Sequence, residues 1–192
     1  MKEEPVIFLC LGSNQGDRAG TLLRACEMIV HDVGPIIKQS SLYETEPWGM
    51  EGVNLFLNQV IRVTSDLQPH ELLKVVLGIE EESGRIRDTR YGIRDTRYAS
   101  DDPRLTSHLS PLTSYLPRSI DIDILFYGEL VLDTPELTIP HPLLAERRFV
   151  LVPLAEFAGE WVHPVLGKSM KELLACCRDS SDVSPHQAHR TQ

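Results

Sequence analysis

The sequence predicts an α+β domain of the ferredoxin-like type, a βαββαβ sandwich whose antiparallel sheet carries helices on its faces, with a β-hairpin extension. Two observations predict it. The expected elements follow one another as strand, helix, strand, strand, helix, strand. Two strands are adjacent in the middle and helices separate the others, whereas a doubly wound fold needs stricter alternation of strand and helix.

The first strand and the first helix have clear signals. Residues 5–13 form a short apolar run, which predicts a buried strand. Residues 17–34 carry apolar side chains at helical spacing. Asp17 is the expected N-cap and Gly34 the expected stop, so the helix should lie between them.

The next three elements complete the first half of the predicted fold. Residues 36–48 and 54–65 have the extended pattern of strands. Residues 68–84 are predicted to be helical, with Pro69 in the first turn and Gly84 at the end.

The second half begins after a segment without a convincing period. Residues 119–140 predict a strand, a turn at Gly128 and a short return strand, which form the hairpin extension. Residues 146–158 and 169–178 are expected to be short helices. We expect a single domain over residues 1–178, followed by a polar tail at 179–192 that we expect to be disordered.

Composition narrows the class of protein. With 192 residues and 42% hydrophobic content, one core should fold without disulfides or metal staples. The four cysteines form no C-x-x-C pair, which favours free thiols in a reducing cytoplasm. No apolar run is long enough for a membrane span, and a formal net charge of -9 disfavours nucleic acid as a partner. We expect a cytoplasmic monomer that acts on small molecules.

A long segment before the second half has its own character. IRDTRY occurs at 86–91 and again at 93–98, which is a local duplication because the period is far too short for a solenoid. We expect residues 88–116 to be a long inserted loop, and such loops are usually lids or disordered insertions. The segment is rich in arginine, which suggests a small anionic ligand: Arg85, Arg87, Arg90, Arg94, Arg97 and Arg104.

Two aspartates interrupt an apolar strand. Asp121 and Asp123 share one face because residues two apart in a strand point the same way, while Ile120, Ile122 and Ile124 point into a core. Two neighbouring carboxylates suit Mg²⁺, which completes its shell with phosphate oxygens and water. The alternative is a solvated strand face.

Other features bear on a phosphate site. Arg118, three residues before Asp121, offers bidentate contacts to phosphate oxygens. Neither common phosphate-loop motif is present. The Gly-rich LGSNQGD at 11–17 is interpreted as a strand exit with a helix cap.

Six motifs in order resemble one family, the 6-hydroxymethyl-7,8-dihydropterin pyrophosphokinases of folate biosynthesis. The resemblance covers residues 6 to about 175, and PRSIDIDIL is its most specific part. The motifs are LGSN (11–14), YETEPWG (43–49), FLNQV (56–60), IEEESGRIR (79–87), PRSIDIDIL (117–125) and IPHPLLAERRFVLVPL (139–154).

The resemblance implies an ATP- and Mg-dependent enzyme that transfers pyrophosphate from ATP to the hydroxymethyl group of the pterin and releases AMP. It implies that Asp121 and Asp123 hold two Mg²⁺ ions. Arg85 and Arg118 match catalytic positions near the transferred group. Whether either aspartate also takes the hydroxyl proton stays open, because a metal-bound hydroxyl already has a lowered pKa.

The family's substrate contacts map onto further residues. Those implied for the pterin are Thr45, Glu46, Trp48, Phe56, Asn58 and Phe149, and those implied for ATP are Glu80, Arg87, Arg90, Arg118, His141 and Arg147. Several have plain structural alternatives: core packing for Phe56 and Trp48, a solvated charge for Glu80, and a structural role for His141. A register slip of one would put Arg148 in place of Arg147.

The chain also departs from the family pattern. Family members often carry R-W-G-P-R before the aspartates, but here R-Y-G at 90–92 is far from Pro117. Either Arg90 with Tyr91 or Arg97 with Tyr98 fits the Arg–aromatic role. Two readings compete with the enzyme: a nucleotide- or pterin-binding module without turnover, and an Mg-dependent nucleotidyltransferase acting on another alcohol.

Overall fold

A computed structural model of the chain describes residues 5–48, 54–84 and 119–187. These ranges contain helices and strands, with a 3₁₀ turn at Leu144–Glu146 before the third helix. In chain order they are β1 (Val6–Ser13), α1 (Arg18–Asp32), β2 (Ile36–Gln39), β3 (Tyr43–Thr45), β4 (Phe56–Thr64), α2 (Pro69–Glu82), β5 (Asp121–Tyr127), β6 (Leu132–Asp133), β7 (Thr138–Ile139), α3 (Arg148–Ala158), α4 (Met170–Cys176) and β8 (Val183–Pro185).

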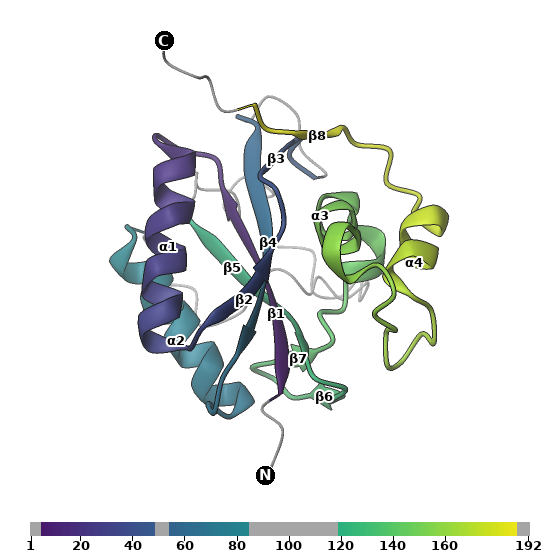
Figure 1. Ribbon diagram of the computed structural model, residues 1–192, viewed down its shortest axis with the longest axis horizontal. Helices are drawn as coiled ribbons and strands as arrows, with labels where there is room; N and C mark the ends of the chain where they lie inside the picture. The colour runs from purple at the N-terminus through teal and green to yellow at the C-terminus, as the bar shows by residue number, and fades with distance from the viewer. Residues whose placement is uncertain (1–4, 49–53, 85–118, 188–192) are drawn as a thin grey trace, which may run out of the picture.

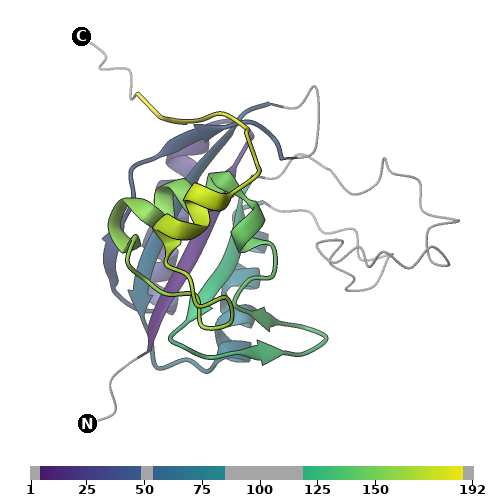
Figure 2. The ribbon, with the colours of Figure 1, turned by 90° about the vertical axis from the view of Figure 1, so that its right-hand side faces the viewer.

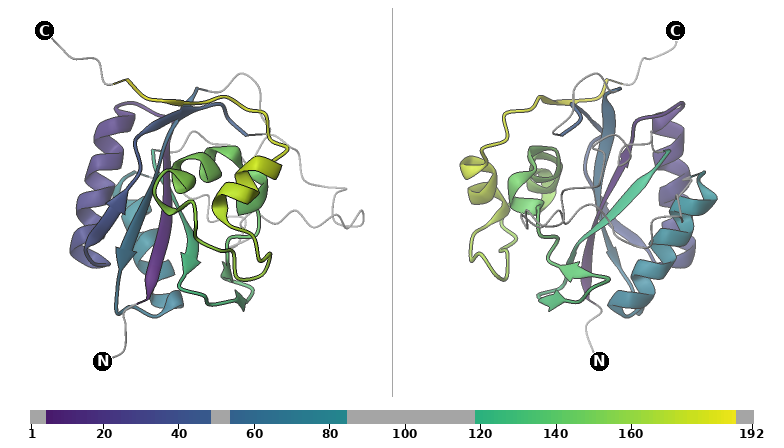
Figure 3. Two further views of the ribbon diagram at one scale, coloured as in Figure 1. Left: turned by 45° about the vertical axis from the view of Figure 1, so that its right-hand side comes forward. Right: turned by 180° about the vertical axis from the view of Figure 1, so that it is seen from behind.

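An antiparallel sheet lies between two layers of helices, so the predicted α+β class is confirmed. The strand order is β5-β1-β4-β3-β8, and β2 also pairs with β4. Helices α1 and α2 cover one face of the sheet, and α3 and α4 cover the other (Figure 1). Figure 2 shows α3 and α4 in front of the sheet, and the rear view in Figure 3 shows the sheet against α1 and α2. The short strands β6 and β7 form a separate two-stranded sheet.

The strand registers gather polar and small residues on the α3/α4 face. Gly12 of β1 lies opposite Asn58 of β4 and opposite Asp121 of β5. Cys10 lies opposite Asp123 in the same ladder. Directly opposed residues share a face, so one surface of three adjacent strands carries them all.

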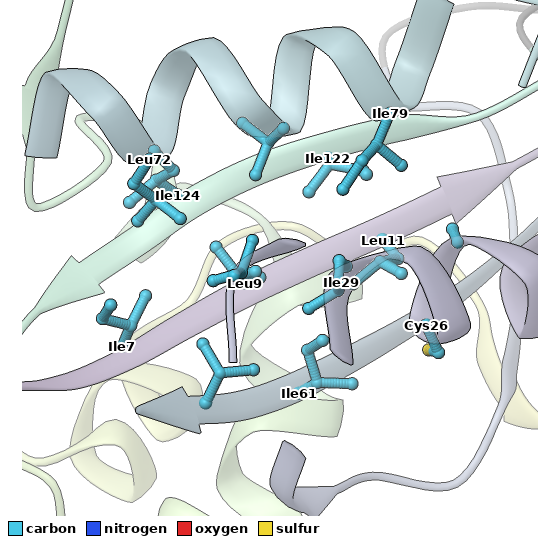
Figure 4. Close-up of a cluster of buried hydrophobic side chains, with 14 of the residues drawn as sticks. Ile7, Leu9, Leu11, Cys26, Ile29, Ile61, Leu72, Ile79, Ile122 and Ile124 are labelled. Carbon is cyan, nitrogen blue, oxygen red and sulfur yellow. The ribbon is translucent and has the colours of Figure 1, made fainter. Parts of the chain in front are cut away.

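The opposite face of β5 carries buried isoleucines, of which Ile122 and Ile124 are labelled in Figure 4. Ile120, Ile122 and Ile124 are at most 5% exposed and pack into the core beneath α1 and α2. This confirms that the isoleucines of the Asp-Ile alternation point into a core. A buried row of this kind holds the strand firmly, since each isoleucine contributes about 1.5–3 kcal/mol on burial.

A second core lies under α3 and α4. Phe8 of β1 meets Phe126 of β5 edge-on, with ring centroids 5.9 Å apart, and Trp161 packs 5.0 Å from Phe8. Leu151 and Leu154 of α3 are fully buried against this group. The second core anchors α3, whose first residues enter the site described below.

The two early helices begin as predicted. The side chain of Asp17 accepts a hydrogen bond from the backbone N–H of Gly20 at 2.9 Å, and α1 ends before Gly34. Helix α2 has Pro69 at its first position and ends at Glu82. None of the described helices has the length and apolar character that a membrane crossing requires.

Two expectations differ from the structure. The strand expected over 36–48 is divided into β2 and β3, because the Ser40 hydroxyl accepts the N–H of Val60 at 3.1 Å and interrupts the ladder. The tail expected to be disordered from residue 179 instead contains β8, which pairs with β3 (Figure 2). Residues 188–192 and the expected loop at 88–116 lie outside the described residues.

Candidate active site

The two aspartates of β5 form the centre of the site. Asp121 and Asp123 face the α3/α4 side of the sheet, opposite the buried isoleucines. Asp123 is only 7% exposed, whereas Asp121 is half-buried at the strand entrance. A solvated strand face does not describe Asp123, since a carboxylate at this depth needs cationic or hydrogen-bonding partners.

Two cationic or donor side chains approach Asp123. Arg147 Nη1 lies 3.7 Å from Asp123 Oδ2, and His141 Nε2 lies 4.0 Å from the same oxygen. Both side chains are nearly buried, at 11% and 6% exposure. The structure therefore brings His141 and Arg147 to Asp123, which lies 18 or more positions before them in the sequence.

Local bonds orient the histidine. The backbone N–H of His141 donates to the carbonyl of Leu125 in β5 at 3.0 Å, which ties the segment after β7 to the sheet. His141 Nδ1 accepts the N–H of Leu143 at 3.2 Å. The neutral ring then carries its proton on Nε2, the nitrogen that faces Asp123.

Arg147 also lies between two aromatic rings. Its guanidinium carbon is 5.1 Å from the centroid of Trp48 and 5.6 Å from that of Phe149. Both distances are in the range of cation–π attraction. One guanidinium thus links the segment after β3, the first turn of α3 and the buried carboxylate of β5.

A polar cluster lies on the neighbouring strands. Asn58 Nδ2 donates to Thr45 Oγ1 at 2.7 Å, and both residues are buried. A Cβ at Gly12 would lie 2.6 Å from Asn58 Oδ1 and 3.8 Å from the ring of Phe56. Gly12 therefore leaves the space that the Asn58 amide occupies. Phe56 is only half-buried, so simple core packing does not account for it.

The chain also matches a known protein family. The model of the family described as 7,8-dihydro-6-hydroxymethylpterin-pyrophosphokinase (HPPK) matches residues 8–97 and 104–159, most of the chain. The chain belongs to the HPPK family.

Named relatives agree with this assignment. The chain is 38% identical over 160 residues to a 2-amino-4-hydroxy-6-hydroxymethyldihydropteridine pyrophosphokinase of Porphyromonas gingivalis, which covers 83% of this chain and 94% of the relative. A protein of the same name from Aquifex aeolicus is 36% identical over 166 residues, covering 86% and 88%.

Solved structures show the same fold. An HPPK-DHPS structure in complex with substrates matches with a TM-score of 0.61 and 14% identity, over 90% of this chain and 43% of that one. Plasmodium falciparum HPPK-DHPS with pteroate matches with a TM-score of 0.65 and 17% identity, over 91% and 42%. The chain thus spans less than half the length of these structures.

Glu80, in the HPPK motif IEEESGRIR, is buried. The alternative that it is a solvated charge on the helix is therefore wrong. Glu80 is 0% exposed, and Oε1 accepts the backbone N–H of Ile122 at 2.8 Å. Ile122 lies between Asp121 and Asp123, so α2 holds β5 at the centre of the site. The predicted contact of Glu80 with ATP stays a prediction.

Other HPPK positions are only partly accounted for. The carboxylate of Glu46 is exposed and accepts the N–H of Asp182 at 3.3 Å, so its predicted contact with pterin stays a prediction. Arg147, rather than Arg148, approaches Asp123. Four predicted residues lie outside the described part of the chain: Arg85, Arg87, Arg90 and Arg118.

Sequence reasoning missed three residues around the HPPK site. Gly12 belongs to LGSN, where its lack of a side chain was the available signal. Cys10 precedes it and lies opposite Asp123; burial, and then the charges of Asp123 and Asp121, raise the pKa of its thiol. Asp179 carried no signal, because its partner Arg148 is distant in sequence.

Proposed function

We propose that the chain transfers pyrophosphate from ATP to the hydroxymethyl group of 6-hydroxymethyl-7,8-dihydropterin, releasing AMP, as a step of folate biosynthesis. The observation that carries the proposal is the buried Asp123, with Asp121 on the same strand face and Arg147 and His141 beside it. The proposal is supported by two relatives that match most of the chain and are named as pyrophosphokinases of this pterin.

The donor set fits magnesium. Asp121 and Asp123 would hold two Mg²⁺ ions and supply hard carboxylate oxygens, the ligands this ion prefers. Within the described ranges no group of three or more His, Cys, Asp or Glu side chains forms a ready metal cage. That suits Mg²⁺, which takes one or two carboxylates and fills its shell with phosphate oxygens and water. Bound there, the metal would neutralise the charge of the triphosphate.

The chain's own residues then position the reactants. In the reaction the bond from the β-phosphorus to the oxygen that bridges it to the α-phosphorus breaks, and the pterin hydroxyl oxygen bonds to the β-phosphorus. AMP leaves and the hydroxyl loses its proton. Arg147 and His141 Nε2 supply donors to triphosphate oxygens, a role that needs positioning and charge more than covalent catalysis. Arg85, Arg118, Arg87, Arg90 and Glu80 are proposed to complete the ATP site.

The pterin would bind on the neighbouring strands. Phe56 and Phe149 are proposed to lie on either side of its flat ring, where burial and stacking favour a heteroaromatic. Asn58 and Thr45 offer an amide and a hydroxyl to its polar edge. Trp48 and Glu46 are proposed to border the same pocket.

The proposal extends to the fold type, the location and the domain boundaries of the enzyme. The order β5-β1-β4 with β2 and β3 beyond supports the ferredoxin-like assignment. The β6–β7 pair is the proposed hairpin extension, although its strands pair with each other and not with β5 across the turn at Gly128, as was expected. We propose that the enzyme is a cytoplasmic monomer. The pyrophosphokinase domain was expected over residues 1–178, but β8 at Val183–Pro185 belongs to its main sheet, so the proposed domain includes that strand. Residues 88–116 are proposed to be a lid over ATP.

Nucleotide chromatography tests the reaction. The chain with ATP, Mg²⁺ and 6-hydroxymethyl-7,8-dihydropterin should give AMP only when the pterin is present. Asp121→Ala should abolish the AMP and leave the fold unchanged, whereas Asp66→Ala, at an exposed position, is the matched control and should stay active. ADP as the product would show ordinary phosphoryl transfer. Pyrophosphate release, with AMP joined to an alcohol, would show a nucleotidyltransferase. Tight binding with no product would show a binding module, and each result overturns the proposal.

A further inference from the structure

The C-terminal segment 177–187 returns from α4 to the edge of the sheet. Beyond α4 the chain is extended, passes above α3 and reaches β3 (Figures 2 and 3). There β8 pairs antiparallel with β3, with Val183 opposite Thr45 and Pro185 opposite Tyr43. The N–H of His186 donates to the carbonyl of Leu42 at 2.8 Å and extends the contact by one bond. We call residues 177–187 the C-terminal strap.

We propose that the C-terminal strap positions two walls of the substrate site, and that Asp179 is its principal positioning residue. One wall is the first turn of α3, which carries Phe149 next to Arg147. The other is the segment from Thr45 to Trp48. This inference rests on the proposed pyrophosphokinase function, because it assigns a substrate-binding consequence to these contacts.

Asp179 holds the start of α3. Its Oδ2 accepts the backbone N–H of Arg148 at 2.9 Å. Arg147, the N-cap residue, makes no side-chain cap bond. Asp179 instead supplies, from a distant part of the chain, an acceptor for one of the N–H groups that the first turn of α3 leaves without a helical partner. Arg148 lies between Arg147 and Phe149, the residues whose side chains enter the site.

Asp179 is itself held in place. Its Oδ1 accepts the N–H of Ser181 at 3.0 Å and the hydroxyl of Ser181 at 2.7 Å. Burial alone would raise the pKa of Asp179, but the hydrogen bonds from Ser181 and Arg148 outweigh it and leave the pKa below its ordinary value. The carboxylate therefore stays ionised at neutral pH, and an ionised acceptor makes the stronger hydrogen bond.

The strap also fixes the end of β3. The N–H of Glu46 donates to the carbonyl of Asp182 at 3.4 Å, and the N–H of Asp182 donates to Glu46 Oε2 at 3.3 Å. Two residues further on, Trp48 lies against the guanidinium of Arg147. The strap thus bonds to a residue near each partner of that cation–π contact. Asp182 bonds Glu46, two residues before Trp48, and Asp179 bonds Arg148, the residue after Arg147.

Steady-state kinetics with the full-length chain test the inference. Asp179→Ala should raise the KM for the pterin about tenfold with a smaller change in kcat, because it loosens ground-state positioning and leaves the reacting groups in place. Asp179→Asn keeps an oxygen that accepts the N–H of Arg148 and should recover most of the affinity. Ser180→Ala, at an exposed position of the strap, is the control.

Hydrogen exchange of the Arg148 amide gives a readout that does not depend on turnover. Exchange should be faster in Asp179→Ala than in wild type and close to wild type in Asp179→Asn. If wild type forms no AMP, the proposed function fails. Hydrogen exchange of the Arg148 amide, and the Kd for pterin measured by titration, would then still show whether Asp179 positions the start of α3. If wild type forms AMP while Asp179→Ala matches it in KM, or loses kcat alone, the positioning inference is refuted.

Discussion

Gly12→Ala is the substitution that the site geometry predicts most directly. The added Cβ would lie 2.6 Å from Asn58 Oδ1, whereas an ordinary contact begins at 3.4 Å. The amide oxygen must therefore retreat by about 0.8 Å, a shift that a packed interior resists. Asn58 has little room to do so, because it is buried and its Nδ2 is bonded to Thr45 at 2.7 Å.

The expected magnitude follows from these contacts. Overpacking of this kind typically costs about 1–3 kcal/mol of the free energy of unfolding, and loss of the Asn58–Thr45 hydrogen bond accounts for about 0.5–1.5 kcal/mol of that change. For a chain of this length the Tm should fall by about 2–12 °C. The KM for pterin should also rise, because Asn58, which is proposed to bind the polar edge of the pterin, is displaced.

Thermal unfolding of four variants measures the effect. In a double-mutant cycle, Gly12→Ala should be costly in wild type and nearly neutral when Asn58→Ala has removed the obstructing amide. Gly78→Ala is the control, because nothing lies within 4 Å of its Cβ position in α2 and a helical alanine should raise stability by about 0.5–1 kcal/mol. An equal cost of Gly12→Ala in both backgrounds would refute the steric reasoning.

Three further predictions concern buried polar groups. Glu80→Leu leaves the N–H of Ile122 without its acceptor and should lower the free energy of unfolding, measured in urea, by about 1–3 kcal/mol. Glu80→Gln should recover part of this loss. Equal stability of wild type and both variants would contradict the buried hydrogen bond. Burial lowers the pKa of His163 below its ordinary 6.5, so the unfolded chain takes up the proton first as the pH falls. Its effect on stability should be absent above about pH 7 and grow as a loss below about pH 6.5, and His163→Gln should flatten that slope in unfolding measured from pH 7 to 5. The exposed Cys176 should react with a thiol reagent in the folded protein, whereas Cys10, whose pKa burial raises, should react only after unfolding; rapid labelling of both would count against its burial.

The parts of the fold that the sequence predicted are those with a local cause. Asp17 caps α1 because its carboxylate reaches an N–H three residues away, a bond that needs no tertiary partner. The alternation at Asp121 and Asp123 predicted two faces because side chains of a strand alternate whatever the strand packs against. The class of the fold followed from such elements and their order.

The parts that escaped prediction depend on distant partners. The division of residues 36–48 arises from Ser40, whose hydroxyl bonds a strand twenty residues away. The strap at 177–187 is ordered by Arg148 and Glu46, so its own polar composition indicated only a tail.

The candidate site shows the same division. The family motifs named Asp123, His141 and Arg147, but only the folded chain shows that the three meet. Glu80 stands in a run of three glutamates that is typical of a solvated helix. Its spacing of four from Val76 and eight from Leu72, both buried, was the signal that it faces the core.

The edges of the main sheet have a consequence for solubility. An exposed edge strand offers unpaired backbone groups to other chains and invites aggregation. Here the N–H of Ile122 on the outer strand β5 is occupied by the Glu80 carboxylate, and the carbonyl of Leu125 by the N–H of His141. At the other side β8 is only three residues long and ends in Pro185, which has no N–H to donate. Glu80 and His141, two residues of the proposed site, therefore also occupy backbone groups that the edge strand β5 would otherwise present to another chain.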